Sequence, residues 1–245
     1  MLSTRIPSQV TVSIFAGLAA ALFFAIASAA PPSSYVAFTQ DTRNLIESGD
    51  VDRGEALHAA FSEETGAACL GCHGQDSLSL NPAWPSLAGQ NAEYLYKQLQ
   101  DFKYGRRINP NSVFGAYMAS YANALNDQDM ADLAVYYESL GGKAGEYAEA
   151  GVHAEDLSAA EQLARYGDGS RLIPSCNACH GAQGQGMPVG VPRLAGQNAL
   201  YFEETMQGYK TGTRNNDVYG VMRHIVEVLS DDEIRQLAVY YAKMK

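Results

Sequence analysis

The stretch Cys69-Leu70-Gly71-Cys72-His73 recurs as Cys176-Asn177-Ala178-Cys179-His180, and these two pentapeptides contain all four cysteines of the 245-residue chain. Helix geometry places residues three and four apart on one face, so each set of two thiols and one histidine can reach a single flat ligand. In a Cys-x-x-Cys-His site the thiols add to the vinyl groups of a haem and the histidine binds its iron. The sequence therefore predicts two haem c groups. The attachment residues are Cys69, Cys72, Cys176 and Cys179, and the iron ligands are His73 and His180.

Other uses of paired cysteines explain this pattern less well. One structural zinc needs four ligands within reach, whereas 107 residues separate the two pairs. Redox-active dithiols and structural disulfides of an exported protein are further possibilities. None of these alternatives accounts for a histidine placed directly after both pairs. Haem attachment accounts for it.

The chain begins with an apolar segment that resembles an export signal. Arg5 is the only charged residue before Asp41, and the apolar stretch ends in Ala27-Ser28-Ala29-Ala30. This pattern is typical of a signal peptide over residues 1–29, cleaved after Ala29. The segment is also close to the ~20 residues that span a bilayer, so an uncleaved inner-membrane anchor is the alternative. Both readings place the chain in the periplasm, and the anchored form adds membrane association.

Beyond residue 50 the chain is a tandem duplication. Leu87-Ala88-Gly89-Gln90-Asn91 recurs as Leu194-Ala195-Gly196-Gln197-Asn198, at the same shift of 107 residues as the cysteine pairs. Further on the shift falls to 104, where Ala134-Val135-Tyr136-Tyr137 matches Ala238-Val239-Tyr240-Tyr241. Single-residue matches are Pro85 with Pro192, Tyr94 with Tyr201, Gly105 with Gly212 and Arg107 with Arg214. Such self-similarity predicts two domains with one haem each.

Each half is expected to be a few helices joined by long loops. Leu95, Leu99 and Phe102 fall at i, i+4 and i+7, and Phe202, Met206 and Tyr209 repeat that spacing. Ser230 with Glu233 is a capping box that begins the last helix, and Asn126 with Asp129 takes its place in the first half. We expect an all-α chain. Its parts are a 30–50 extension, a domain over 51–140, a linker over 141–155 and a domain over 156–245.

A haem iron bound by histidine still needs a sixth ligand, and the duplication narrows the choice. Equivalent sites should use the same residue type at equivalent positions, and among the seven methionines only Met118 and Met222 are paired. Met130, Met206 and Met244 match other apolar residues, as core positions do, and Met187 matches Leu80. We therefore predict Met118 and Met222 as the axial partners of the two histidines.

The same comparison sets the remaining histidines aside. His58 matches Arg165, His224 matches Ser120, and His153 lies in the linker. None has a counterpart in the other half, so we expect these three at the surface.

These features together resemble the dihaem cytochrome c4 family. The shared order is Cys-x-x-Cys-His, then Pro-x-Leu-Ala-Gly-Gln, a tyrosine-containing helix and a methionine before the last helix, all repeated once between about Val51 and Lys245. The resemblance implies two tandem class I cytochrome c domains with facing haem propionate edges. It also implies that Pro85 and Pro192 offer backbone carbonyls to the ring N–H groups of His73 and His180. Electron transfer in the bacterial periplasm towards a terminal oxidase is the implied function.

Charge and ligation limit the partners. The net charge of −10 makes nucleic-acid binding unfavourable and favours redox partners with basic docking patches. Candidate donors are a quinol-oxidising complex, a cytochrome or a copper protein, and the acceptor is a terminal oxidase. An alternative is the electron-accepting cytochrome subunit of a dehydrogenase complex. A dihaem enzyme such as a peroxidase or thiosulfate dehydrogenase would need one iron with a displaceable ligand, which the matched methionines disfavour.

Overall fold

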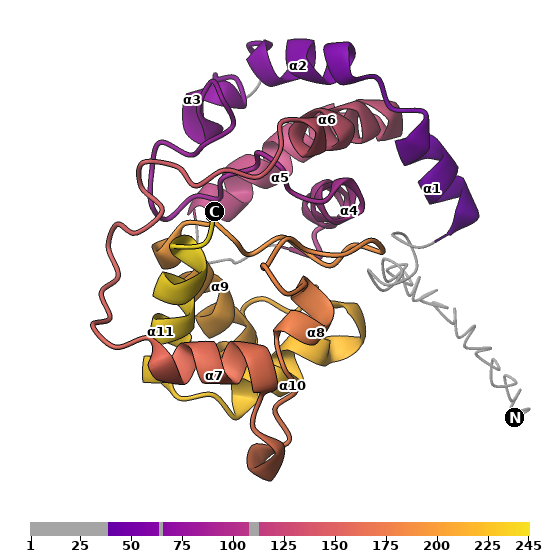
Figure 1. Cartoon of the computed structure of the whole chain (residues 1–245). Coiled ribbons are helices and arrows are strands. Elements are labelled where there is room, and N and C mark those ends of the chain that lie inside the picture. Colours follow the sequence, from indigo (N-terminus) through magenta and orange to yellow (C-terminus); the bar gives the residue numbers. More distant parts are fainter. Residues whose placement is uncertain (1–38, 64–65, 108–112) are drawn as a thin grey trace, which may run out of the picture.

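The computed structural model describes residues 39–63, 66–107 and 113–245. Within these ranges the regular structure is helical, with a few isolated β-bridges and no strand. Figure 1 shows two helical groups in chain order, the first from indigo to magenta and the second from orange to yellow. The all-α prediction is therefore confirmed. The signal peptide or anchor expected over residues 1–29 lies outside the described residues.

The first group is arranged around α6. Its helices are α1 (Gln40–Glu47), α2 (Val51–Ala59), α3 (Leu70–His73), α4 (Ala92–Lys103), α5 (Val113–Ala124) and α6 (Asp127–Ser139). Helix α6 packs against α1, α2 and α4, and α4 also packs against α5. Leu95 of α4 and Met130, Leu133 and Tyr137 of α6 are among the buried side chains that form the core. The burial of Met130 agrees with its expected place in the core.

The second group repeats this arrangement around α11. Its helices are α7 (Ser158–Tyr166), α8 (Asn177–His180), α9 (Ala199–Thr211), α10 (Val221–Glu227) and α11 (Asp231–Ala242), with short 3-10 turns at Gly169–Arg171 and Val218–Gly220. Helix α11 packs against α7 and α9, and α10 packs against α9. Phe202, Met206 and Tyr209 are buried along α9, which confirms the periodicity read from the sequence.

Both expected capping boxes are present. The Asn126 side chain accepts from the backbone of Asp129, whose carboxylate accepts from Asn126 N–H, and α6 begins there. Ser230 and Glu233 make the same reciprocal pair at the start of α11. These pairs satisfy backbone donors that would otherwise have no partner in the first helical turn.

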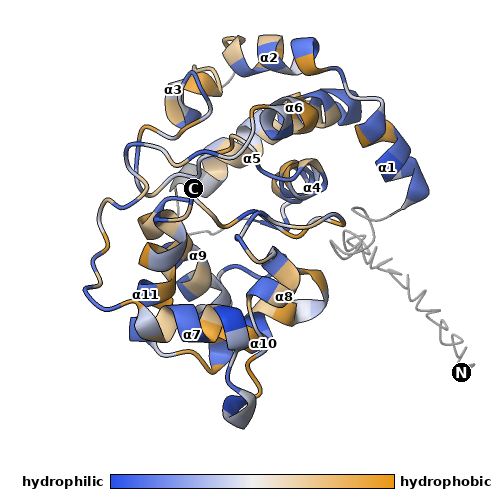
Figure 2. Ribbon diagram, in the orientation of Figure 1, coloured by the Kyte–Doolittle hydropathy of each residue, from blue (hydrophilic) through white to orange (hydrophobic). Residues whose placement is uncertain are grey.

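The segments outside the repeat pack onto it. Helix α1 is mostly hydrophilic (Figure 2), and its buried residues are Thr42 and Ile46, of which Ile46 joins the first core. Between α6 and α7 the chain runs without a helix, and Ala148 and Val152 of this stretch are buried in the second core. None of the helices in the described residues is long and apolar enough to cross a bilayer.

The repeated Leu-Ala-Gly-Gln-Asn motif forms a turn beside the last turns of α6 and α11. Gly89 N–H donates to Tyr137 O at 2.7 Å, and Gly196 N–H donates to Tyr241 O at 2.9 Å. Both glycines have φ near +70°, where side chains are strained, and a Cβ on Gly89 would lie 2.1 Å from Gly142 N. Only glycine therefore lets the motif approach the 141–143 segment this closely.

Candidate haem sites

Each Cys-x-x-Cys-His pentapeptide forms a single helical turn. The His73 N–H donates to Cys69 O at 3.0 Å, and the His180 N–H donates to Cys176 O at 2.9 Å. Each turn ends at a glycine with φ near +82°, Gly74 in the first half and Gly181 in the second. The turn places two thiols and one imidazole on the same side of a short helix, as one porphyrin requires.

The two histidine rings are fixed in the same way. Nδ1 of His73 lies 3.0 Å from Pro85 O, and Nδ1 of His180 lies 2.9 Å from Pro192 O. A carbonyl only accepts, so Nδ1 carries the proton, and no described residue makes a hydrogen bond to either Nε2. Burial lowers the pKa of both imidazoles, which keeps them neutral. A neutral ring with a bound Nδ1–H and an available Nε2 is the form that binds iron.

The four thiols are free, and none forms a disulfide. Burial raises the pKa of Cys69 and Cys176, and each of these thiols has a tyrosine hydroxyl beside it, Tyr137 and Tyr241 respectively. Within the part of the chain that the structure describes, no cluster of three or more His, Cys, Asp or Glu side chains could hold a metal ion. Neither the disulfide nor the zinc alternative therefore gains support.

The predicted axial methionines come from other helices. Met118 is on α5 and Met222 is on α10, and both are half-buried. Met222 packs against the second core. Met130 and Met206 are fully in the cores, whereas Met187 is 43% exposed. Burial therefore separates these three from the two paired positions, but it does not separate Met244, which is also half-buried against the second core.

One expectation about the histidines is wrong. His153 and His224 are exposed as expected, but His58 is only 2% exposed. Its Nε2–H donates to Gly74 O at 3.0 Å, and its Nδ1 accepts from the Tyr137 hydroxyl at 3.1 Å. Burial lowers its pKa, so the ring is neutral. His58 thus holds the end of the first Cys-x-x-Cys-His turn through a hydrogen bond to Gly74. Its match in the second half, Arg165, is exposed.

Two half-buried arginines lie where the two halves meet. Arg107 of the first half donates to the Tyr201 hydroxyl at 2.8 Å, and Arg214 of the second donates to the Tyr94 hydroxyl at 3.1 Å. Burial alone would raise the pKa of Tyr201, but the charges of the two arginines lower it to about 7. Neither arginine forms an ion pair with a described residue.

A second set of charges lies beside these arginines. Lys97, 2% exposed, is paired with buried Asp101 and donates to Asn216 O at 2.6 Å. Arg106 donates to the same carboxylate at 2.8 Å. Asp101 is the one carboxylate that the described residues place against this cluster, so positive charge is in excess. A group that brings carboxylates, as haem does through its propionates, fits this donor set.

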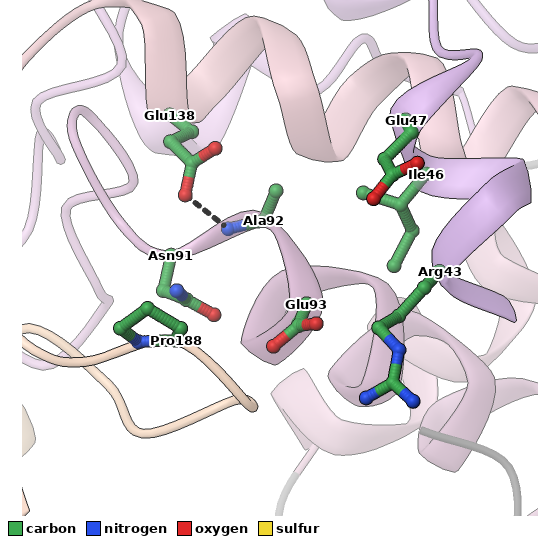
Figure 3. A pocket seen from close by; sticks show the side chains of 8 residues that line it. All are labelled: Arg43, Ile46, Glu47, Asn91, Ala92, Glu93, Glu138 and Pro188. Atoms are coloured by element: carbon green, nitrogen blue, oxygen red, sulfur yellow. Dashed lines mark hydrogen bonds between the residues drawn. The ribbon is translucent and has the colours of Figure 1, made fainter. Parts of the chain in front are cut away.

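A cleft of about 210 Å³ also lies between the halves, away from these groups. Figure 3 shows Arg43, Ile46 and Glu47 of α1 on one side and Asn91, Glu138 and, from the second half, Pro188 on the other, with the Glu138 carboxylate accepting from Ala92 N–H at 2.9 Å. None of the residues predicted to bind haem lines it. The cleft is therefore not part of the haem sites.

A protein-family model described as cytochrome c matches residues 51–141 and 167–245. Cytochrome c4 of Thiocapsa roseopersicina is 38% identical over 194 residues, which cover 78% of this chain and 91% of that protein. The chain belongs to the dihaem cytochrome c4 family. It has two haem c groups and transfers electrons, as cytochrome c4 proteins do, rather than catalysing a reaction on a substrate.

Two further comparisons describe the breadth of the family. The crystal structure of reduced recombinant cytochrome c4 from Pseudomonas stutzeri superposes with a TM-score of 0.67 at 33% identity, covering 81% of this chain and all of that one. A protein named thiosulfate dehydrogenase electron acceptor, from Stutzerimonas stutzeri, is 38% identical over 178 residues, 72% of this chain and 79% of that protein. The resemblance to cytochrome c4 and the two tandem cytochrome c domains expected from the sequence are thus confirmed.

Several residues around the cytochrome c4 sites were missed by sequence reasoning. His58 has no counterpart in the other half, so the duplication gave no sign of it. Tyr137 and Tyr241 were matched but had no role assigned, and the same is true of Arg107 and Arg214. Their exact repetition in both halves was the available signal.

Proposed function

We propose that this cytochrome carries electrons in the periplasm from a respiratory donor to a terminal oxidase. In this proposal each haem is held by one pentapeptide, with thioether bonds to Cys69 and Cys72 in the first half and to Cys176 and Cys179 in the second. The axial pairs are His73 with Met118 and His180 with Met222. Each haem supplies a one-electron couple between ferric and ferrous iron.

The observation that carries the proposal is the duplicated histidine arrangement. In both halves a buried neutral imidazole donates through Nδ1 to a proline carbonyl, which leaves Nε2 for iron. Half-buried methionines at equivalent positions supply a second ligand to each site. An iron with two protein ligands has no open position for oxygen or peroxide, so the arrangement suits a carrier.

The remaining residues act on the charge of the sites. Arg107 and Arg214 would pair with propionates at the interface, which would reduce the excess of positive charge there. Pro85 and Pro192 hold the proton on Nδ1 and fix the plane of each ring. The acidic exterior of the chain favours an acceptor or donor with a basic docking surface.

A kinetic experiment tests the oxidase as acceptor. The reduced holoprotein is mixed with a purified haem–copper oxidase, and the reoxidation rate is followed optically at rising ionic strength. We expect rapid reoxidation that slows as salt screens the attraction between opposite charges. A rate that stays negligible at all salt concentrations would contradict this acceptor. Recovery of the protein in the cytoplasmic fraction of its host would contradict the periplasmic location.

A second candidate function is supported by one of the relatives. The Stutzerimonas stutzeri relative is named an electron acceptor of thiosulfate dehydrogenase, so a similar task in a dehydrogenase complex is the alternative. Affinity purification of the native protein distinguishes the two functions. A dehydrogenase that co-purifies in equal amounts through high salt would favour the second, and a free monomer would favour the first.

A further inference from the structure

Two equivalent glutamines cross the boundary between the halves in opposite directions. Gln197 of the second half accepts through Oε1 from Ser86 N–H at 3.0 Å and donates through Nε2 to Ser86 O at 3.0 Å. Gln90 of the first half makes the same pair with Arg193, at 2.7 Å to its N–H and 3.0 Å to its O. Both glutamine residues are less than 10% exposed. The interface therefore has a local two-fold symmetry built on these two side chains.

The peptide groups that the glutamines bind are the ones that hold the histidines. Ser86 N–H and Pro85 C=O belong to one peptide group, and that carbonyl accepts from His73 Nδ1–H at 3.0 Å. A continuous chain thus runs from Gln197 Oε1 through this peptide to the first histidine. The equivalent chain runs from Gln90 Oε1 through the Pro192–Arg193 peptide to His180, whose Nδ1–H donates at 2.9 Å.

A peptide whose N–H donates a hydrogen bond becomes a stronger acceptor at its C=O, because bonds in such a chain polarise one another by perhaps 10–30% each. A stronger acceptor draws the Nδ1 proton and makes the imidazole a better electron donor to iron. Ferric iron gains more from that donation than ferrous iron. Each glutamine should therefore favour the ferric state of the haem at the far end of its chain.

We propose that the two glutamines are positioning residues that tune the haems crosswise. Gln197, in the second half, controls how strongly the imidazole of His73 in the first half donates electrons to iron. Gln90, in the first half, does the same for His180 in the second. This inference rests on the proposed function only in taking the two histidines as iron ligands. The potential of each haem then depends on the intact contact between the halves.

The test uses the holoprotein with Gln90→Leu and Gln197→Leu, which keep the side-chain volume and remove both hydrogen bonds across the interface. Each also removes the bond that Oε1 accepts from the N–H of the next residue. The two haems are distinguished by nuclear Overhauser contacts of their thioether protons, and each potential is read from a redox titration followed by NMR. Gln197→Leu should raise only the potential of the haem at Cys69 and Cys72. Gln90→Leu should raise only the other. We expect a shift of about threefold in the ferric-to-ferrous equilibrium, ~28 mV at 59 mV per tenfold.

Two further variants keep the test decisive. Asn198→Ala removes bonds of 3.2 Å to Asn81 O and 2.8 Å to Trp84 O across the same interface, but leaves the Pro85–Ser86 peptide bound. It should leave the difference between the two potentials unchanged. Gln197→Glu, protonated in this buried place, can restore both bonds if the leucine variant does not fold, and it should keep the wild-type potentials.

The crosswise pattern is what a merely structural role would not produce. If either leucine variant moved both potentials equally, or only the potential of its own half, the inference would be overturned. Unchanged potentials in both variants would overturn it as well. A wild-type protein without two reversible one-electron steps would instead contradict the proposed function, so the two failures can be told apart.

Discussion

The two halves of this cytochrome share a haem-binding framework but differ in what surrounds it. Both have a Cys-x-x-Cys-His turn, a proline carbonyl on the histidine, a tyrosine beside the first cysteine and a glutamine that reaches across. Only the first half has the buried His58 and the buried pair of Lys97 and Asp101. Their matches in the second half are Arg165, Glu204 and Gly208. Duplication has thus kept the residues proposed to bind haem, and divergence has altered their electrostatic surroundings.

If the two haems have the proposed ligands in common, this difference gives them unequal potentials. Lys97 and Asp101 lie against Asn216, on the segment that leads to Met222, so they act on the second site from the first half. His58 acts on the first site from within its own half. Unequal potentials give an electron a preferred haem, which suits a carrier that meets its donor and its acceptor in turn.

The largest effect is expected from the axial methionines. Met118→Ala should lower the potential of the first haem alone and Met222→Ala that of the second alone, because methionine favours ferrous iron more than water or a second histidine does. The fall should be on the order of a few tenths of a volt, within the ~0.8 V that axial ligands span. Spectroelectrochemistry measures it, with exposed Met187→Ala as the control. Two variants with wild-type potentials would refute the ligand assignment.

The next effect concerns the asymmetric buried charges. Asp101→Asn leaves the buried Lys97 ammonium without its carboxylate, and breaking one side of such a pair costs roughly 3–5 kcal/mol of unfolding free energy. Denaturant unfolding followed by circular dichroism measures this cost. Asp232→Asn, which breaks an exposed pair with Arg235, is the control and should leave the unfolding free energy unchanged. Equal effects of the two substitutions would contradict the account.

The matched tyrosines should respond unequally. Tyr137→Phe leaves a buried nitrogen of His58 without a partner, which costs about 1–3 kcal/mol. Tyr241→Phe loses a 3.3 Å bond to half-buried Asn177 and the hydroxyl beside Cys176, and should cost about 1 kcal/mol or less. Thermal unfolding of the two variants side by side makes the comparison. A larger loss for Tyr241→Phe would mean that His58 does not depend on its tyrosine.

The smallest effect is the contribution of His58, in the first half, to the pH dependence of stability. Burial lowers the pKa of His58 in the folded protein below its ordinary 6.5, so the unfolded chain binds the extra proton. The stabilisation is fully present above pH 6.5 and is lost as the pH falls towards the lowered value, by at most about 1.4 kcal/mol per pH unit. His58→Gln should flatten this fall in a denaturant series from pH 7 to 5. His224→Gln, at an exposed site, should reproduce the wild-type slope.

Features that depend on residues close together in the chain could be predicted from the sequence. The spacing of Cys69, Cys72 and His73 reflects helix geometry, and the capping boxes at Asn126 and Ser230 are local patterns that the structure contains as expected. The helices α4 and α9 follow from apolar periodicity in the same way. These features depend on neighbours within a few residues, which a sequence shows directly.

Contacts between the halves could not be predicted, because the repeat does not say how two domains face each other. Gln90 and Gln197 were visible as repeated residues, but their partners lie more than 100 positions away. We expect His58 at the surface because it has no counterpart, but it lies on α2 and contacts Gly74, 16 residues away, and no local pattern in the sequence indicates that contact. The relative placement of the two halves and contacts made through irregular segments could therefore not be predicted from the sequence.

The most direct test of the central claim is a spectroelectrochemical titration of the purified holoprotein, with carbon monoxide added after full reduction. We predict two reversible one-electron steps at high potential, a long-wavelength methionine-to-ferric-iron band and no carbon monoxide binding. A low-potential haem that binds carbon monoxide would mean that one iron lacks its methionine. That result would contradict an account in which both halves are built as electron carriers.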